Sequence, residues 1–158
     1  MKIELLLTGR TTTPYIQEGI DVYMARLRRY SPQVELRILP DVRTSRSLTP
    51  QRQMQLEAEA MLAALDGADW VVLLDEHGRQ FTSREFSAYL ERKANTVARR
   101  MVFVVGGPYG FDDSVRRRAD EKISLSAMTF SHEMVRLFFI EQIYRAMTIS
   151  RGEPYHHE

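Results

Sequence analysis

The sequence contains no cysteine, so disulfides, thiolate metal sites and cysteine nucleophiles are all excluded. It also lacks any apolar run near the ~20 residues that a membrane-spanning helix needs. The opening segment MKIELLLTGR has one lysine and a short apolar stretch interrupted by glutamate, which is too little for a secretory signal peptide. We therefore expect a protein that stays in the cytoplasm, with no membrane partner and no bound metal ion.

Positive and negative charges nearly balance, with a net charge of +1 over 158 residues, but the positive charges are unevenly distributed. Arginine strongly outnumbers lysine, and the guanidinium fork suits phosphate because it binds two oxygens at once. The arginines gather in three clusters: Arg26, Arg28 and Arg29; Arg43 and Arg46; and Arg116, Arg117 and Arg118. Any one cluster is explained by a solvated surface, whereas three together favour an anionic partner such as RNA.

Apolar runs and amphipathic periods alternate along the chain, which predicts a single α/β domain over residues 1–158, with a mostly parallel sheet and helices on both faces. Strands are expected at 3–9, 34–40, 69–75, 100–107 and 122–126, and helices at 14–29, 50–65, 83–97, 112–120 and 131–150. Thr13, Thr49 and a Thr82–Glu85 capping box are the expected helix starts. Residues 76–80 are expected to turn, and residues 41–48 to form a mobile loop.

The stretch VFVVGGPYGF, residues 102–111, passes from an apolar strand straight into glycines. It has neither the lysine of a P-loop nor the glycine spacing of a Rossmann turn, and Pro108 removes an N–H group that a phosphate cradle would use. Gly110 suits a turn that needs a positive φ. Gly106 and Gly107 together indicate that a flat or crowded ligand lies against the backbone.

Two more segments, LLDEHG (73–78) and SLSAMTF (124–130), end at the same expected sheet edge. Parallel α/β sheets bind ligands at the carboxyl ends of their strands, so the three segments together predict a ligand site. The second segment is either a loop that recognises an adenine through backbone groups and apolar contact, or only a helix start capped by Thr129 or Ser131. The residues leave both interpretations open.

The expected helix at 131–150 is apolar nearly all round. A helix without a polar face is buried on several sides, and one small core does not cover all of it, so this pattern predicts a homodimer. Its polar residues then need partners or a role, and Glu141 and Arg145 are spaced i, i+4 for an ion pair. These polar residues are Arg136, Glu141, Gln142, Tyr144 and Arg145.

The segment RGEPYHHE, residues 151–158, is an unusual ending that offers Tyr155, His156, His157 and Glu158 after a Gly-x-Pro bend. It is a metal ligand set, the remnant of a tag, or a functional tail. We set the metal interpretation aside, because one tetrapeptide does not readily encircle a metal ion and no other ligand is evident.

Taken together, these segments resemble the RlmH family of large-subunit ribosomal RNA methyltransferases, which belong to the SPOUT class. The resemblance covers essentially the whole chain and rests on LLDEHGRQFTSREF (73–86), FVVGGPYGF (103–111), ADEKISLSAMTFSHEMVRLFFIEQIYRAMTI (119–149) and GEPYHHE (152–158). It implies a trefoil-knotted fold, a homodimer and bound S-adenosyl-L-methionine. The implied reaction is methylation at N3 of a pseudouridine in helix 69 of 23S ribosomal RNA, within the assembled ribosome. It also implies that the terminal histidines are native.

Carried over by position, the resemblance assigns the cofactor contacts to the ends of the three segments. These contacts are Leu74, Gly107, Leu125, Ser126, Ala127, Met128, Thr129 and Phe130. We expect a bulky side chain at Gly107 to block the cofactor before it disturbs the fold. His77 is expected to be exposed or to contact RNA.

The implied chemistry points to a second set of residues, since the N3 proton of an imide must leave for N3 to attack a methyl group. His156, His132 and Glu141 are the candidate bases, and the sequence does not rank them. Arg145 is a candidate for stabilising the imide anion, and Tyr155 for stacking on or hydrogen-bonding the base. We hypothesise that the tail of one subunit closes the cofactor site of the other.

Two other function classes stay open at this point. One is a different nucleotide-binding α/β enzyme, such as a reductase, which would bind a dinucleotide instead of S-adenosylmethionine. The other is a ribosome-binding factor that keeps the fold without catalysis, in which case loss of the protein would leave ribosomal RNA modification unchanged.

Overall fold

The computed structural model describes residues 1–42 and 48–157, so most of the predicted loop at 41–48, with Arg43 and Arg46, lies outside the described residues. The elements in chain order are β1 (Lys2–Thr8), α1 (Pro14–Leu27), β2 (Gln33–Leu39), α2 (Pro50–Ala64), β3 (Trp70–Gln80), α3 (Ser83–Thr96), β4 (Arg100–Val105), α4 (Asp113–Arg118), β5 (Glu121–Ser124) and α5 (Met134–Ser150). Within these residues, no helix has both the length and the apolar character that crossing a membrane requires.

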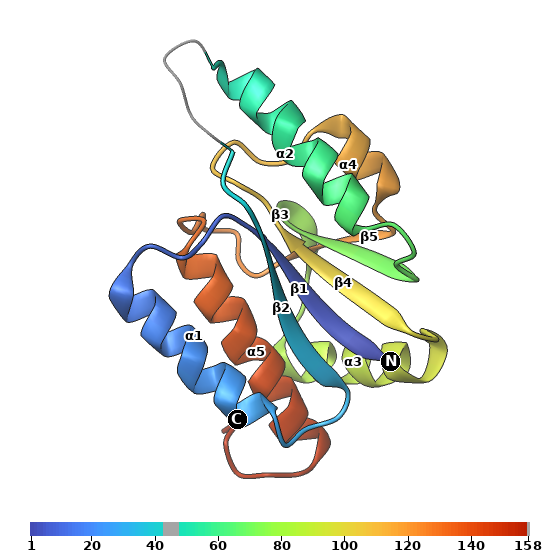
Figure 1. Ribbon diagram of the computed structural model, residues 1–158. Coiled ribbons are helices and arrows are strands. Elements are labelled where there is room, and N and C mark those ends of the chain that lie inside the picture. Colours follow the sequence, from blue (N-terminus) through green and yellow to red (C-terminus); the bar gives the residue numbers. More distant parts are fainter. Residues whose placement is uncertain (43–47, 158) are drawn as a thin grey trace.

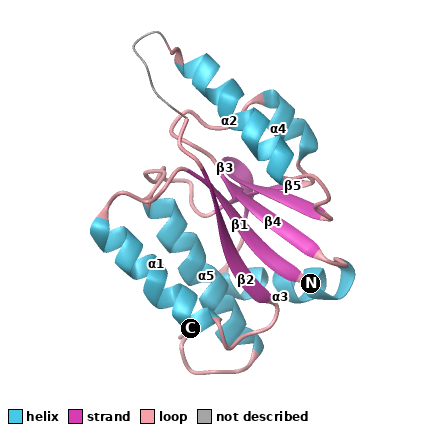
Figure 2. Ribbon diagram, in the orientation of Figure 1, coloured by secondary structure: helices cyan, strands magenta, loops and turns pink. Residues whose placement is uncertain are grey.

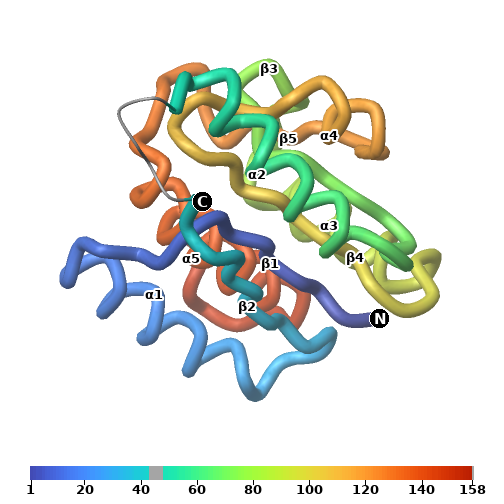
Figure 3. Tube along the Cα trace, turned by 45° about the horizontal axis from the view of Figure 1, so that its top comes forward, coloured from blue at the N-terminus to red at the C-terminus, as the bar shows by residue number. Residues whose placement is uncertain are grey.

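The described strands form one five-stranded sheet in the order β2-β1-β4-β3-β5, and neighbouring strands in it pair in parallel. Helices α1, α3 and α5 cover one face, and α2 and α4 cover the other (Figures 1 and 2). Figure 3 shows α1 and α2 on opposite sides of the strands. The predicted α/β class, with a parallel sheet and helices on both faces, is confirmed; the threading of a knot stays a prediction.

The burial of each strand explains its pattern of apolar and polar residues. β1 and β4 lie inside the sheet between two helical layers, so both of their faces are apolar, and Ile3, Leu5, Val102 and Phe103 are fully buried. β2 is an edge strand, and its alternating exposure matches its alternating apolar and polar residues.

The helix starts agree with the sequence at two places and differ at a third. Thr49 accepts a hydrogen bond from the Arg52 N–H group, and the Thr82–Glu85 capping box is present. Thr13, however, makes no side-chain cap bond at the start of α1. The Glu133 carboxylate, 120 residues further on, accepts from the Thr13 N–H group instead, at 3.0 Å. A distant side chain therefore holds the segment that leads into α1, while the Thr13 side chain makes no cap bond.

The prediction of a turn at residues 76–80 is wrong, because these residues belong to β3, which continues to Gln80. Leu74 and Arg79 both stand opposite Ile123 of β5, so the four residues between them bulge out of the ladder. Gly78 permits this bulge: a Cβ atom there would lie 2.6 Å from backbone atoms of Ile123. The bulge carries Asp75, Glu76 and His77 to the sheet edge.

Helix α5 packs on the sheet between α1 and α3 (Figure 1), and this position accounts for most of its apolar surface. Leu137 contacts α1, where a Cβ atom at Gly19 would meet its methyl groups at 2.9 Å. Phe138 is 39% exposed. Packing within one chain therefore accounts for part of the all-round apolar pattern, Phe138 remains exposed, and the homodimer stays a prediction.

Arg136 of α5 is the most deeply buried charged residue of the described chain, at 1% exposure. Its guanidinium donates to the carbonyl oxygens of Thr8 at 2.7 Å and Gly9 at 3.0 Å, and to the Thr11 hydroxyl at 2.9 Å. Burial lowers the pKa of Arg136, and the nearby carboxylates of Glu133 and Asp41 oppose that shift. This side chain ties the end of β1 to the start of α5.

Glu133, one turn earlier, makes a second tie and is expected to make the fold acid-sensitive. Its pKa falls from an ordinary 4.5 to about 2, mainly because the Thr13 N–H group donates to the carboxylate; burial opposes this shift, and hydrogen bonds from Thr12 add to it. A lowered pKa means that this stabilisation is complete above the ordinary pKa and is lost as the pH falls through the folded-state value.

We therefore expect the free energy of unfolding of the wild type to fall more steeply between about pH 5 and pH 2 than that of Glu133→Gln. Urea unfolding curves recorded across this range measure both slopes. Equal slopes in the two proteins would show that the Glu133 carboxylate does not contribute.

Candidate functional site

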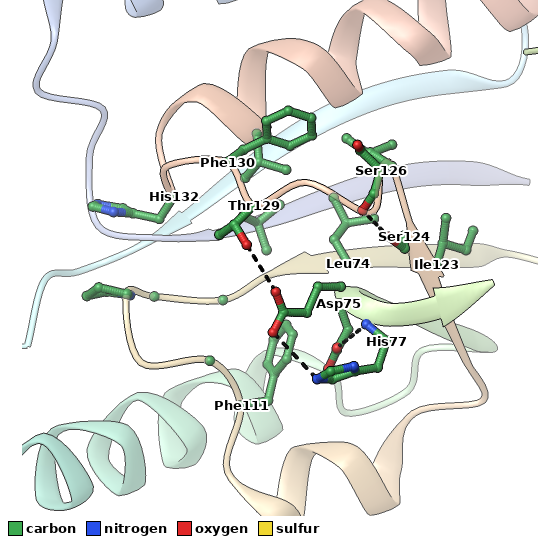
Figure 4. A pocket seen from close by; sticks show the side chains of 18 of the residues that line it. Leu74, Asp75, His77, Phe111, Ile123, Ser124, Ser126, Thr129, Phe130 and His132 are labelled. Atoms are coloured by element: carbon green, nitrogen blue, oxygen red, sulfur yellow. Dashed lines mark hydrogen bonds and ion pairs between the residues drawn. The ribbon is translucent and has the colours of Figure 1, made fainter. Parts of the chain in front are cut away.

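The three predicted segments do meet at one edge of the sheet, around a cavity of about 440 Å³. The ends of β3, β4 and β5 supply its walls, and Figure 4 shows Leu74, Ile123 and Phe130 from different segments facing one another. Of the eight predicted cofactor contacts, seven line the cavity: Leu74, Gly107, Leu125, Ser126, Met128, Thr129 and Phe130. Ala127 is not among the lining residues.

The glycine segment closes one wall with a tight turn. The Gly110 N–H group donates to the Gly107 carbonyl at 3.1 Å, and Gly110 has a φ of +82°, as the sequence predicted for this position. Gly106 lies against the Phe111 ring, which a Cβ atom would meet at 3.2 Å. Both features bring the backbone itself to the cavity.

Gly107 requires a correction. A Cβ atom there would lie 2.8 Å and 3.0 Å from the two carboxylate oxygens of Glu57, a residue of α2 that is only 4% exposed. Even a small side chain would therefore displace a buried carboxylate. A substitution at Gly107 disturbs the packing on α2 as well as any ligand, so it does not test the ligand site cleanly.

The loop at 125–130 is fixed by short-range hydrogen bonds and by one bond across the cavity. The Ser124 hydroxyl donates to the Ser126 carbonyl at 2.8 Å, and the Met128 N–H group donates to the Ser126 hydroxyl at 3.0 Å. The Thr129 hydroxyl donates to Glu76 on the β3 bulge at 3.2 Å (Figure 4). Ser131, and not Thr129, caps the turn that leads into α5, since its hydroxyl accepts from the Met134 N–H group at 3.1 Å.

Opposite charges are paired at the floor of the cavity. Asp75 accepts from Arg116 at 2.8 Å and from the His77 N–H group at 2.9 Å. Burial alone would raise the pKa of Asp75, but the His77 N–H bond and the Arg116 guanidinium outweigh it and leave the pKa lowered. His77 is exposed, as expected, and lies 3.5 Å from Glu76.

Four of the five predicted catalytic residues form a second group, away from the cavity. Glu141 Oε1 accepts from Arg145 at 2.7 Å and from the Tyr155 hydroxyl at 2.9 Å. Arg145 also contacts His156 Nδ1 at 3.0 Å and lies over the Tyr155 ring. The i, i+4 pair is confirmed, and the tail packs on α5. We call Glu141, Arg145, Tyr155 and His156 the tail quartet.

The tail quartet and the cavity lie at different levels of α5. Val135 lines the cavity, and Arg145 lies ten residues, or about 15 Å, further along the helix. Glu141 of the tail quartet and Phe130 are among the residues that line a second, smaller cavity of about 240 Å³. The fifth candidate, His132, lines the main cavity at its outer edge (Figure 4). Within the described residues, no group of acidic or histidine side chains is arranged to hold a metal ion.

Residues 1–156 match the family described as "Predicted SPOUT methyltransferase". The chain belongs to this SPOUT methyltransferase family. It is 54% identical over all 158 residues to a Parabacteroides distasonis protein named "Ribosomal RNA large subunit methyltransferase H", and 48% identical over 157 residues to one of the same name from Christiangramia forsetii. The alignments cover 100% and 99% of each chain, respectively.

Solved structures show the same SPOUT-type architecture at low identity. A tRNA (m1G37) methyltransferase from Aquifex aeolicus is 17% identical, with a TM-score of 0.55 over 100% of this chain and 76% of its own. A probable methylase family protein from Haemophilus influenzae Rd KW20 is 12% identical, with a TM-score of 0.59 over 95% and 66%. At these identities the likeness concerns the fold alone.

The cavity fits the nucleoside methyl donor that the SPOUT methyltransferase family implies. Its volume lies within the 300–1,000 Å³ range typical of small-molecule sites. Apolar side chains of Leu74, Ile123 and Leu125 line it, and Glu76 adds a negative charge that suits a cationic ligand, whereas the charge of Asp75 is balanced by Arg116. Gly106 and Gly107 bring backbone groups within reach of such a ligand without an intervening side chain.

Several lining residues were not predicted from the sequence. Phe111 belongs to the stretch at 102–111 that the sequence singled out, whereas Arg116 and Val135 come from two helices whose packing carries them to the cavity. Arg116 was noted only as part of a basic cluster, and here it pairs with Asp75. No local signal identified Glu57 as the neighbour of Gly107.

Proposed function

We propose that this protein is an S-adenosylmethionine-dependent methyltransferase that methylates N3 of a pseudouridine in helix 69 of 23S ribosomal RNA. It acts as a homodimer on the assembled ribosome, in the cytoplasm. The observation that carries the proposal is the 54% identity, over the full length of both chains, to a protein named as a large-subunit ribosomal RNA methyltransferase. The composition of the cavity supports it independently.

The cavity residues provide binding and orientation. S-adenosylmethionine, when bound, supplies an electrophilic methyl group. Leu74, Gly107 and the loop at 125–130 hold it through backbone groups and apolar contact, and the Thr129–Glu76 hydrogen bond keeps that loop against the β3 bulge. Fixing the two reactants in line accounts for much of the rate in reactions of this type.

The tail quartet stabilises the negative charge that develops when N3 loses its proton. Arg145 is always a donor, so His156 Nδ1 must accept from it, and the neutral ring then carries its hydrogen on Nε2. Glu141 accepts from Arg145, Tyr155 and Gln142, which leaves it suited to positioning these side chains. We assign Arg145 and His156 as donors to the imide, aimed at the growing charge.

His132 is the candidate that remains for taking the N3 proton, since it lines the cavity. General-base help of this kind contributes about 10²–10⁴-fold. His132→Asn is therefore expected to lower the rate of methyl transfer by at least 100-fold and to flatten the acid side of the pH–rate profile. His156→Asn should lower the rate but keep the shape of that profile. The opposite pattern would reassign the base to His156.

A second subunit completes the site in this proposal. The tail quartet does not line the donor cavity of its own chain, and two side chains at the mouth of that cavity are exposed and apolar: Tyr109 is 51% exposed and Met128 77%. The tail of the partner subunit is the occupant we propose for this mouth.

Calorimetry and a labelled-methyl assay test the proposed function. We expect the purified protein to bind S-adenosylmethionine, and to transfer its methyl group to ribosomes that lack the modification. Binding of a dinucleotide in place of S-adenosylmethionine would favour a reductase. Binding without methyl transfer, together with unchanged RNA modification in cells that lack the protein, would leave a non-catalytic ribosome-binding role.

A further inference from the structure

An arginine–tyrosine cluster lies where the ends of α1 and α5 meet. The Arg29 and Arg151 guanidiniums both lie over the Tyr30 ring, 5.1 Å and 4.5 Å from its centroid. Arg26 lies over Tyr23 at 5.1 Å and over Tyr144 at 5.5 Å. Figure 1 shows the chain beyond α5 turning back toward the end of α1, which brings these residues together. With the neighbouring Arg28, we call the four arginines the basic rim.

The basic rim is exposed to solvent and carries more positive than negative charge. All four arginines are exposed. Glu153 lies among them, and its carboxylate is engaged by the Tyr30 hydroxyl at 2.6 Å and by Arg29 at 3.4 Å. Stacking on tyrosine holds a guanidinium plane in place and leaves N–H groups at its edge free to contact phosphate. Arg26, Arg28 and Arg151 form no ion pair with any described residue.

The basic rim is continuous with the tail quartet. Tyr23, which stacks under Arg26, shares a 3.2 Å hydroxyl contact with Tyr155. Tyr144, the second ring beside Arg26, packs edge-on against Tyr155 at 4.8 Å between ring centroids. A nucleic acid strand held at the basic rim would therefore lie next to the residues that we assign to the imide.

We infer that the basic rim is the surface that grips the phosphate backbone of the RNA beside the target nucleotide. This inference rests on the proposed function, and it adds the residues that dock the substrate. Looped RNA suits the surface, because guanidinium planes stack on unpaired bases while their edges contact phosphates. The alternative to RNA binding is a structural role, in which Arg26 and Arg28 only stabilise the negative end of the α1 dipole.

The test removes three charges without touching Arg29, which is bonded to Tyr30 and Glu153. We compare the wild type with Arg26→Gln/Arg28→Gln/Arg151→Gln. The matched control is Arg52→Gln/Arg92→Gln/Arg99→Gln, which removes three exposed arginines from α2, α3 and the segment before β4. Binding is measured to purified ribosomes and to a synthetic RNA hairpin with the helix 69 sequence, over a series of salt concentrations.

The rim variant is expected to bind both probes at least about tenfold more weakly, and to reduce the slope of log K against log salt by about two. Its kcat and its affinity for S-adenosylmethionine should stay near wild type, while KM for ribosomes rises. The control variant should keep the wild-type slope. These readouts separate the two proposals: a wild type that transfers no methyl group refutes the proposed function, whatever the rim variant does.

Three results would overturn the inference. Unchanged affinity and salt dependence for both probes would leave the rim with a structural role only. A loss of ribosome binding with unchanged hairpin binding would assign the rim to a ribosomal protein. Dissociation of the rim variant into monomers, seen by sedimentation, would make the rim a subunit interface.

Discussion

Removing residues 155–158 is expected to abolish methyl transfer while the protein stays folded and dimeric. The truncation deletes the Tyr155 hydroxyl that donates to Glu141 and the His156 ring that accepts from Arg145. It leaves the Arg145–Glu141 pair on α5 intact. Loss of one donor to a developing anion costs about 10²–10³-fold in kcat, so loss of the tail should bring activity below detection in a labelled-methyl assay.

Two controls sharpen this experiment. Tyr155→Phe keeps the ring that packs on Tyr144 but loses the hydroxyl, so it should retain the thermal stability of the wild type and lose activity only in part. In addition, a mixed dimer can pair a truncated chain with a chain whose cavity is filled by Leu125→Trp. If the tail acts on the partner subunit, this mixture regains activity, because one donor cavity and one tail come together. A truncated protein with full activity would refute the role of the tail.

Replacing Arg136 by methionine is expected to lower the free energy of unfolding by about 2–4 kcal/mol. The guanidinium bonds the carbonyl oxygens of Thr8 and Gly9 in a buried position. Each buried acceptor that loses its donor costs about 1–3 kcal/mol, and removing the buried charge recovers part of this loss. Urea unfolding followed by circular dichroism measures the difference.

Arg136→Lys provides the graded comparison, since an ammonium keeps the charge but lacks the planar fork that reaches several acceptors. It should fall between the wild type and Arg136→Met. Arg92→Met, on the exposed surface of α3, should change stability by less than about 0.5 kcal/mol. An Arg136→Met protein as stable as the wild type would show that the buried guanidinium contributes no net stability.

The order of strands and helices could be predicted from the sequence because each element carries its own periodicity. β4 reads as an apolar run, and β1 as one interrupted by Glu4, because helices cover both of their faces, and the Thr82–Glu85 box marked the start of α3. The predictions that failed concern contacts between residues far apart in the sequence. Glu133 bonds the N–H groups of the segment before α1 from a position 120 residues away, and the β3 bulge depends on the backbone of β5.

The position of the cavity was predictable because strands of a parallel sheet all end at one edge. The residues that line the cavity were less predictable. Phe111 lies in the predicted stretch at 102–111, but Val135 reaches the cavity through packing that no spacing reveals, and the contact of Gly107 with Glu57 joins α2 to the glycine turn. Helices α1 and α3 contact α5 and cover much of its apolar surface, yet Phe138 stays 39% exposed, so the homodimer drawn from this surface stays a prediction.

Candidate residues of the tail could be identified from their residue types, but their positions could not. The sequence singled out Tyr155 and His156 as unusual and did not predict where they lie. In the structure, both pack on α5 beside Glu141 and Arg145, and Tyr155 connects them to the tyrosines beneath the basic rim. This arrangement is what turns four separate candidates into one group with assignable donors and acceptors.

The proposed reaction is tested by comparing methylation of intact ribosomes with that of free ribosomal RNA, with the modified nucleoside mapped by mass spectrometry. We expect a single N3-methylated pseudouridine in helix 69, formed on intact ribosomes. A methyl group on another nucleoside, or none on any ribosomal substrate, would contradict it.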